Sequence, residues 1–104
     1  MEIICETKNL KTILTISGRI DVTTSADFEK QVLSQLAEAN EIFLDCSGIE
    51  YISSAGLRSM LIIAKNADTQ NKKVILCRIS KLCHEVLEVS GFDAFFEVRN
   101  DIDS

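Results

Sequence analysis

The chain has 104 residues, 46% of them hydrophobic, which is enough for a single domain over residues 1–104 whose core needs no disulfide or metal. Its formal net charge of −5 has the wrong sign for a phosphate backbone, so we expect no binding to nucleic acid. Because the chain lacks a basic leader and the ~20 consecutive apolar residues of a membrane span, we expect a cytoplasmic protein that does not insert into a membrane. We expect it to be a monomer or a weak dimer.

The start of the chain predicts a β-hairpin. Residues 2–7 and 12–17 are rich in Ile, Leu and Thr, and they flank Lys8 and Asn9, where Asn tolerates the backbone of a turn. Residues 18–21 break this pattern. We therefore expect two antiparallel strands that end at about Ser17.

A helix and a third strand follow the hairpin. Thr23 and Thr24 supply N-cap hydroxyls to a helix that ends near Asn40 and carries apolar side chains at i, i+4 and i+8, namely Phe28, Val32 and Leu36. Residues 41–45 form a short apolar run with a charge at each end, which is typical of a central strand. We expect residues 46–52 to be a loop.

The second half of the chain continues the alternation. Ser53 and Ser54 cap a second helix, whose apolar stripe is Leu57, Met60, Leu61 and Ala64. Residues 74–77 are a strand, and residues 95–98 are a last strand. Between them, Ser80 caps a third helix that stops at Gly91 and carries Leu82, Val86 and Val89.

The order of these elements is β-β-α-β-α-β-α-β. Strands that alternate with helices need crossover connections, which make the strands parallel. The fold class predicted is therefore α/β, a single domain with a mostly parallel central sheet, an antiparallel N-terminal hairpin and helices packed against the sheet.

Two polar loops are candidates for a site. In such a sheet the loops after the strands gather at one edge, where the following helices begin. One loop carries Asp21, Thr23 and Thr24, and the other carries Asp45, Cys46, Ser47, Ser53 and Ser54. The second ends on a helix N-terminus, which favours a phosphate, although serines at this position can also be simple N-caps.

Enzyme chemistry is harder to assemble from these residues. A nucleophilic serine needs a base, and the single histidine, His84, lies on the third helix. Asp21 and Asp45 lack an apolar pocket that would change a pKa, and the glycines are too scattered to bind a nucleotide. The four cysteines contain no C-x-x-C pair. We therefore expect no enzyme activity, no cofactor and no metal. The cysteines are expected to be buried, reduced thiols, although for Cys46 a functional role is also considered.

The residues also carry a family resemblance. Residues 42–57, IFLDCSGIEYISSAGL, resemble the signature of STAS domains, the sulfate transporter and anti-sigma factor antagonist family, and residues 18–21, GRID, resemble its G-x-[LI]-D turn. The likeness extends over essentially the whole chain. It implies that an anti-sigma serine kinase phosphorylates Ser54, and it makes Asp21 the second acid of the site. The residue before this serine, usually Asp in the antagonists, is Ser53 here, so Ser53 is the alternative phosphorylation site.

The resemblance implies a bacterial transcription regulator that works by partner switching. The unmodified protein would bind the kinase and displace its sigma factor, phosphorylation would release it, and a phosphatase would restore binding. The implied partner-binding residues are Asp21, Thr23, Thr24, Asp45, Ser53, Gly56, Leu57 and Arg58. Two alternatives are a cytoplasmic accessory subunit of a membrane transport complex and a sensor of a small anion or nucleotide.

Overall fold

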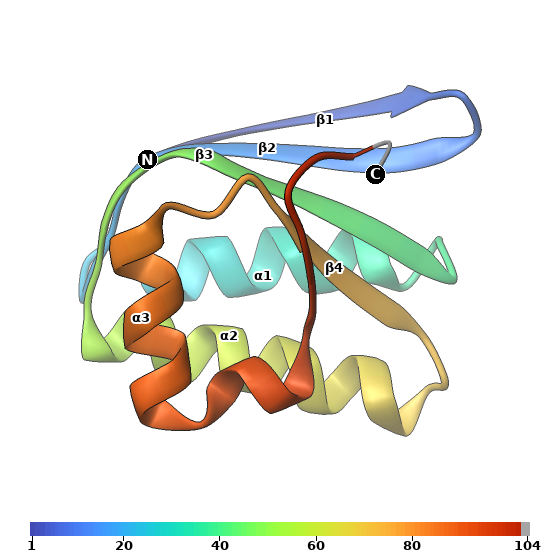
Figure 1. The fold of residues 1–104 in the computed structure, drawn as a ribbon. Coiled ribbons are helices and arrows are strands. Elements are labelled where there is room, and N and C mark those ends of the chain that lie inside the picture. Colours follow the sequence, from blue (N-terminus) through green and yellow to red (C-terminus); the bar gives the residue numbers. More distant parts are fainter. Residues whose placement is uncertain (103–104) are drawn as a thin grey trace.

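One five-stranded sheet, in the order β1-β2-β3-β4-β5, forms one layer of the molecule, and helices α1, α2 and α3 cover one of its faces (Figure 1). This computed structural model describes residues 1–102, apart from the side chain of Asp93. Strands β2 to β5 run parallel, and β1 is antiparallel to β2. The predicted α/β fold class is confirmed. In the described part of the chain, no helix is both long enough and apolar enough to span a membrane.

The predicted hairpin is confirmed, but its second strand is longer than expected. Strand β1 spans Glu2–Lys8 and β2 spans Lys11–Ile20. The turn lies at Asn9 and Leu10, one residue later than predicted, and both have the positive φ that a type I′ turn requires (52° and 67°). The expected break at residues 18–21 was wrong, because Gly18 takes a φ of 95° inside the strand and shifts in pairing register absorb the irregularity.

Helix α1 spans Ser25–Leu36 and buries the three predicted side chains, Phe28, Val32 and Leu36. It ends at Leu36, four residues before the predicted Asn40. Residues 37–40 form a turn that leads into the next strand. The apolar period of the sequence therefore identified the buried face correctly, and only the helix end was misplaced.

Strand β3 spans Glu41–Ile52, so the prediction of a loop at residues 46–52 was wrong. The added length of β2 provides the partner, since Gly18 pairs with Ile49 and Ile20 pairs with Ile52. Gly48 fits this crowded pairing because a Cβ there would lie 2.9 Å from the carbonyl oxygen of Ile16. The two long strands end together at one edge of the sheet.

Helix α2 starts at Ser54, as predicted, spans Ser54–Thr69 and leads into β4, Lys73–Cys77. Its fully buried side chains include Met60, Ile63 and Ala67, whereas the predicted Leu57 and Leu61 are only half-buried. The apolar stripe is thus rotated slightly from the predicted one.

Helix α3 spans Lys81–Ser90 and ends at Gly91, which has a φ of 76°. Its predicted apolar residues Leu82 and Val89 are exposed, and Leu87 is the residue that it buries. A 3₁₀ turn, Phe92–Phe95, follows, so β5 is the short strand Glu97–Arg99 rather than residues 95–98.

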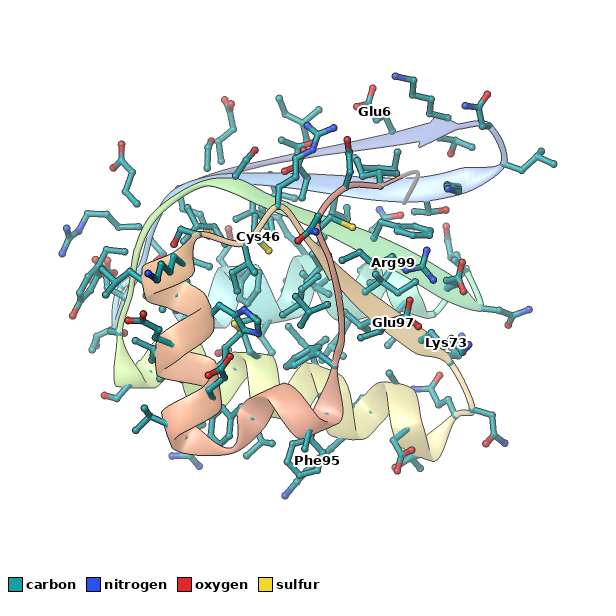
Figure 2. The ribbon with its side chains drawn as sticks, viewed as in Figure 1. Glu6, Cys46, Lys73, Phe95, Glu97 and Arg99 are labelled. Carbon is teal, nitrogen blue, oxygen red and sulfur yellow. The ribbon has the colours of Figure 1, made fainter. Side chains whose placement is uncertain are left out.

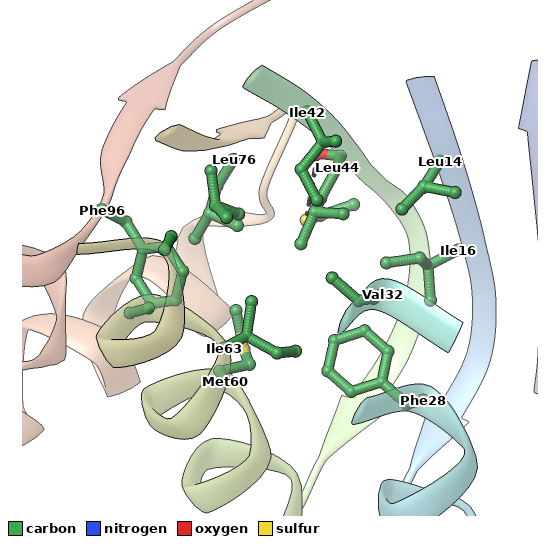
Figure 3. Close-up of a cluster of buried hydrophobic side chains, with 14 of the residues drawn as sticks. Leu14, Ile16, Phe28, Val32, Ile42, Leu44, Met60, Ile63, Leu76 and Phe96 are labelled. Atoms are coloured by element: carbon green, nitrogen blue, oxygen red, sulfur yellow. Dashed lines mark hydrogen bonds between the residues drawn. The ribbon is translucent and has the colours of Figure 1, made fainter. Parts of the chain in front are cut away.

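The core lies between the sheet and the helices (Figure 3). Side chains of the strands, such as Leu14, Ile16 and Leu44, face Phe28 and Val32 of α1, together with Met60 and Ile63 of α2. The other face of the sheet carries a smaller buried cluster, against which the chain end packs Ile102. That cluster consists of Ile13, Phe43, Ile75 and Cys77.

Candidate functional site

The turn after β2 is built around the carboxylate of Asp21. One carboxylate oxygen, Oδ1, accepts hydrogen bonds from the Thr23 hydroxyl (2.7 Å) and the Thr23 backbone N–H (3.0 Å). These bonds stabilise the charged form, so they lower the pKa of Asp21, with the hydroxyl of Thr23 as the largest cause. Asp21 is therefore a fixed negative charge at this edge of the sheet.

Thr24 lies at the N-cap position of α1, but its hydroxyl does not cap the helix. The hydroxyl accepts from the backbone N–H of Asp21 and donates to the carbonyl of Arg19, each at 2.9 Å. The first N–H of the helix, that of Ser25, donates instead to the carbonyl of Asp21 at 2.8 Å. The predicted capping hydroxyl thus closes the Asp21 turn, because this turn presents the hydroxyl with nearer partners.

The start of α2 distinguishes its two serines. The side chain of Ser53 is half-buried and accepts a hydrogen bond from the backbone N–H of Gly56 (3.2 Å), so it is the helix cap. Ser54 is exposed and is the first residue of the helix. Of the two hydroxyls, that of Ser54 is the one accessible to another protein.

Three contacts hold the Asp21 turn and the start of α2 together. The backbone N–H of Ser53 donates to the carbonyl of Ile20 at 2.9 Å, so the residues that follow, Asp21 and Ser54, leave the sheet from adjacent positions. Gly56 is buried where a Cβ would lie 2.8 Å from the Ile52 side chain and 2.9 Å from the carbonyl oxygen of Ile20. The hydroxyl of Ser59 then donates to the carbonyl of Ser25 in α1 (3.2 Å).

Side chains that the sequence did not indicate complete this surface. Val22 is 78% exposed and Tyr51 is 43% exposed. The guanidinium of Arg19 lies 4.3 Å from the centre of the Tyr51 ring, and its Nε lies 3.8 Å from a carboxylate oxygen of Asp21. We call the surface formed by Arg19, Asp21, Val22, Thr23, Tyr51, Ser54 and Arg58 the Ser54 face. Ile49 and Ile52 both pack against the core, and the shift in pairing between Gly18–Ile49 and Arg19–Tyr51 turns Tyr51 outward, so no regular strand pattern in the sequence indicated it.

The remaining predicted partner-binding residues of α2 differ in exposure. Arg58 is exposed, lies four residues after Ser54 and makes no ion pair within residues 1–102. Leu57 is half-buried against the core, and Gly56 is fully buried. Arg58 is thus available to a partner, whereas Gly56 and Leu57 contribute mainly to packing.

Asp45 lies elsewhere, so the predicted loop that carried both Asp45 and Ser54 was wrong. It is buried in the middle of β3, seven residues or about 23 Å of strand before Ile52. One of its oxygens accepts from the hydroxyl of Ser47 (2.8 Å), and the other lies 3.4 Å from Nη1 of Arg78. Arg78 also binds Asp101 in the C-terminal segment at 2.8 Å. Asp45 therefore belongs to a structural network of hydrogen bonds and ion pairs with Ser47, Arg78 and, through Arg78, Asp101.

The cysteines do not form a site in the described part of the chain. Cys46 and Cys77 are buried, and burial raises the pKa of both thiols. Cys46 donates to the carbonyl of Leu44. Cys5, by contrast, is exposed on β1, so the prediction of buried thiols is wrong for this residue. No group of three or more potential metal ligands occurs among the described residues.

Comparison with known proteins gives one family. The family model of the STAS domain matches residues 2–104. The chain is also 32% identical over 89 residues to BtrV of Bordetella bronchiseptica, a candidate anti-sigma factor antagonist, which covers 85% of this chain and 77% of BtrV.

Two solved folds resemble this one closely. TM1081 of Thermotoga maritima, also a candidate anti-sigma factor antagonist, has a TM-score of 0.87 at 21% identity, covering 97% of this chain and 88% of that one. The phosphorylated form of SpoIIAA, a Bacillus cell fate determinant, has a TM-score of 0.73 at 12% identity, covering 98% and 95%. SpoIIAA, an anti-sigma factor antagonist, has also been solved unphosphorylated, with a TM-score of 0.75 at 10% identity, covering 98% of this chain and 91% of that one.

Proposed function

This chain belongs to the STAS domain family, and on that premise we propose that it is an anti-sigma factor antagonist that acts by partner switching. The observation that carries the proposal is the position of Ser54, which is exposed at the first residue of α2 beside the Asp21 turn. In this scheme the protein is a ligand and a substrate of other enzymes, and it catalyses no reaction itself.

The unmodified Ser54 face binds an anti-sigma factor that is also a serine kinase, and the sigma factor held by that kinase is displaced. Val22 and Tyr51 support this role, because two exposed apolar side chains framed by charges suit the centre of a protein interface. Asp21, in the turn beside the start of α2, and Arg58, four residues after Ser54 on the helix, contribute opposite charges to this face. The hydrogen bonds of Asp21 keep it ionised in position, so it needs no ordering when the partner arrives.

The kinase phosphorylates Ser54 rather than Ser53. The Ser53 hydroxyl is half-buried and accepts the capping bond from Gly56, so a kinase reaches it less readily than the exposed hydroxyl of Ser54. Ser54 has neither constraint. Its position at a helix N-terminus also favours a negative group, because the first N–H groups of a helix have no acceptor within it.

Phosphorylation ends binding through charge. A phosphoserine carries about −1.5 to −2 charges at neutral pH, and at Ser54 these would lie beside Asp21 in the interface. Arg58 is four residues further along the same helix, the spacing and direction at which an acid pairs best with a base. The phosphate therefore also withdraws Arg58 from the partner. A phosphatase that removes the phosphate restores the binding surface.

The test compares Ser54→Asp and Ser54→Ala by calorimetric titration against the purified kinase. We expect Ser54→Ala to bind like the unmodified protein and Ser54→Asp to bind about tenfold more weakly or worse, which corresponds to about 1.4 kcal/mol. Both variants should stay folded, since an acid at the first turn of a helix complements its dipole. Equal affinities of the two variants would overturn the phospho-switch.

Mass spectrometry after incubation with kinase and ATP tests the assignment of the phosphate. We expect one phosphate, on Ser54, which is lost in Ser54→Ala. Ser53→Ala is the matched control, because it removes the neighbouring hydroxyl and leaves Ser54 in place; it should still be phosphorylated. Phosphate found only on Ser53 would contradict the assignment.

A further inference from the structure

The outer edge of β1 is open. The strand lies at one end of the sheet, and no strand within residues 1–102 pairs with its outer side (Figure 1). All of its residues from Glu2 to Lys8 pair with β2 in one continuous register, without a bulge or a proline. A regular edge of this length presents unpaired N–H and C=O groups that can bind another strand.

The hairpin geometry determines which backbone groups point outward. A type I′ turn joins Lys8 and Lys11 as a hydrogen-bonded pair, and such pairs alternate along an antiparallel ladder. Every second residue back from Lys8 therefore bonds to β2. The backbone groups that point away from the sheet belong to Ile3, Cys5 and Thr7.

We propose that this edge binds the same edge of a second copy of the chain, antiparallel, with the twofold axis at Cys5. Ile3 of one copy then lies opposite Thr7 of the other, and the two Cys5 residues lie opposite each other. Each such pair exchanges two backbone hydrogen bonds, about six in total. The two five-stranded sheets become one continuous sheet with the helices on a common face.

The charges along β1 select this register and this partner. With the axis at Cys5, Glu2 of each copy lies opposite Lys8 of the other, so the dimer gains two cross-strand pairs of opposite charge. Moving the axis to Ile4 would place Glu2 opposite Glu6, and moving it to Glu6 would place two copies of Glu6 opposite each other. Like charges opposite each other destabilise a sheet. The edge is thus complementary to itself in one register.

The contact is limited to the strand edge. Glu6 extends from β1 into solvent (Figure 2), and in the dimer it lies opposite Ile4, which is half-exposed in the single chain. Because the interface is a single strand pair, we expect a weak, concentration-dependent dimer of the smallest interface class. The Ser54 face includes no residue of β1 and is not part of the contact, so this proposal is independent of the proposed function.

A charge exchange tests the register. In sedimentation equilibrium of the untagged chain, the average mass should rise from monomer towards dimer with concentration. Glu2→Lys alone and Lys8→Glu alone each turn two attractive pairs into repulsive ones, and each should weaken dimerisation about 2- to 30-fold. The double variant, and an equimolar mixture of the two single variants, should restore it. A monomeric mass at every concentration, or equal association of the single and double variants, would overturn the proposal.

Oxidative cross-linking tests the axis. Opposite residues of a hydrogen-bonded pair have Cα atoms about 5.5 Å apart, within the range that a disulfide spans. Diamide, which accepts two electrons and two protons from two thiols, should therefore link two chains through Cys5. We would use Cys83→Ser as background, since Cys83 is the other thiol that is not fully buried, and add Cys5→Ser as the control. Equal cross-linking in that control would place the contact elsewhere.

Discussion

Gly56 fits where α2 begins because it has no side chain, and Gly56→Ala tests how rigid that approach is. An added Cβ would lie 2.8 Å from the Ile52 side chain, 2.9 Å from the Ile20 side chain and 2.9 Å from the Ile20 carbonyl oxygen. The two side chains can move slightly. The carbonyl oxygen cannot, because it accepts the hydrogen bond from Ser53 that joins α2 to β2.

The expected change in stability follows from three effects. Overpacking in a well-packed region costs about 1–3 kcal/mol, and loss of the hydrogen bond between Ser53 and Ile20 adds about 0.5–1.5 kcal/mol. Alanine offsets about 1 kcal/mol of this through its higher helix propensity. We therefore expect Gly56→Ala to lower the free energy of unfolding by about 2 kcal/mol, or the melting temperature by about 10 °C.

Urea unfolding followed by circular dichroism measures this change. Hydrogen exchange of the Ser53 amide reports whether its hydrogen bond to the Ile20 carbonyl has opened. The matched control is Gly91→Ala, where an added Cβ meets no atom within 4 Å but φ is 76°. It should lose about 1 kcal/mol through backbone strain alone and leave the Ser53 amide protected. A Gly56→Ala variant as stable as the wild type would refute the close-packing argument.

Two further predictions concern ionisable groups. In an NMR titration, the pKa of Asp21 should lie below its ordinary value of 3.8 and rise in Thr23→Val, because the stabilising hydroxyl is lost. The contribution of Asp21 to stability is then complete above its unfolded pKa and is lost as the pH falls through the folded pKa. An unchanged pKa of Asp21 in Thr23→Val would contradict the role of the Thr23 hydroxyl. With a thiol reagent, Cys5 should react in the native protein, whereas Cys46 should react only after unfolding, because it is buried and burial raises its pKa. Rapid native modification of Cys46 would show that β3 opens locally.

Features set by local hydrogen bonds could be predicted from the sequence. Ser53 and Ser80 each cap a helix by accepting from the N–H three residues further on, as their positions before an apolar stripe indicated. Gly91 ends α3 because glycine adopts positive φ without strain. These signals depend on only a few neighbouring residues.

Features set by distant pairing could not be predicted in the same way. Residues 46–52 look like a loop because they include Ser47, Gly48 and Glu50, yet β2 extends past Gly18 and provides a strand partner for them. That extension places Asp45, expected at the exposed end of a short strand, in the buried middle of a long one. The position of Ser54 beside Asp21 was expected from the sheet edge and the family resemblance, but the exposure of Val22 and Tyr51 depends on where both strands end.

The spatial order of the strands in the sheet, β1-β2-β3-β4-β5, is also the order in which a ribosome synthesises them. Each strand can therefore pair with a neighbour that has already been synthesised, and no strand needs a later segment to be inserted between it and the strand before it. Helix α2 can cover β3 before β4 exists. Nascent chains arrested with residues 1–69 outside the ribosome should accordingly protect β2 and β3 from protease, and full sensitivity of that stretch would show that the sheet forms only after release.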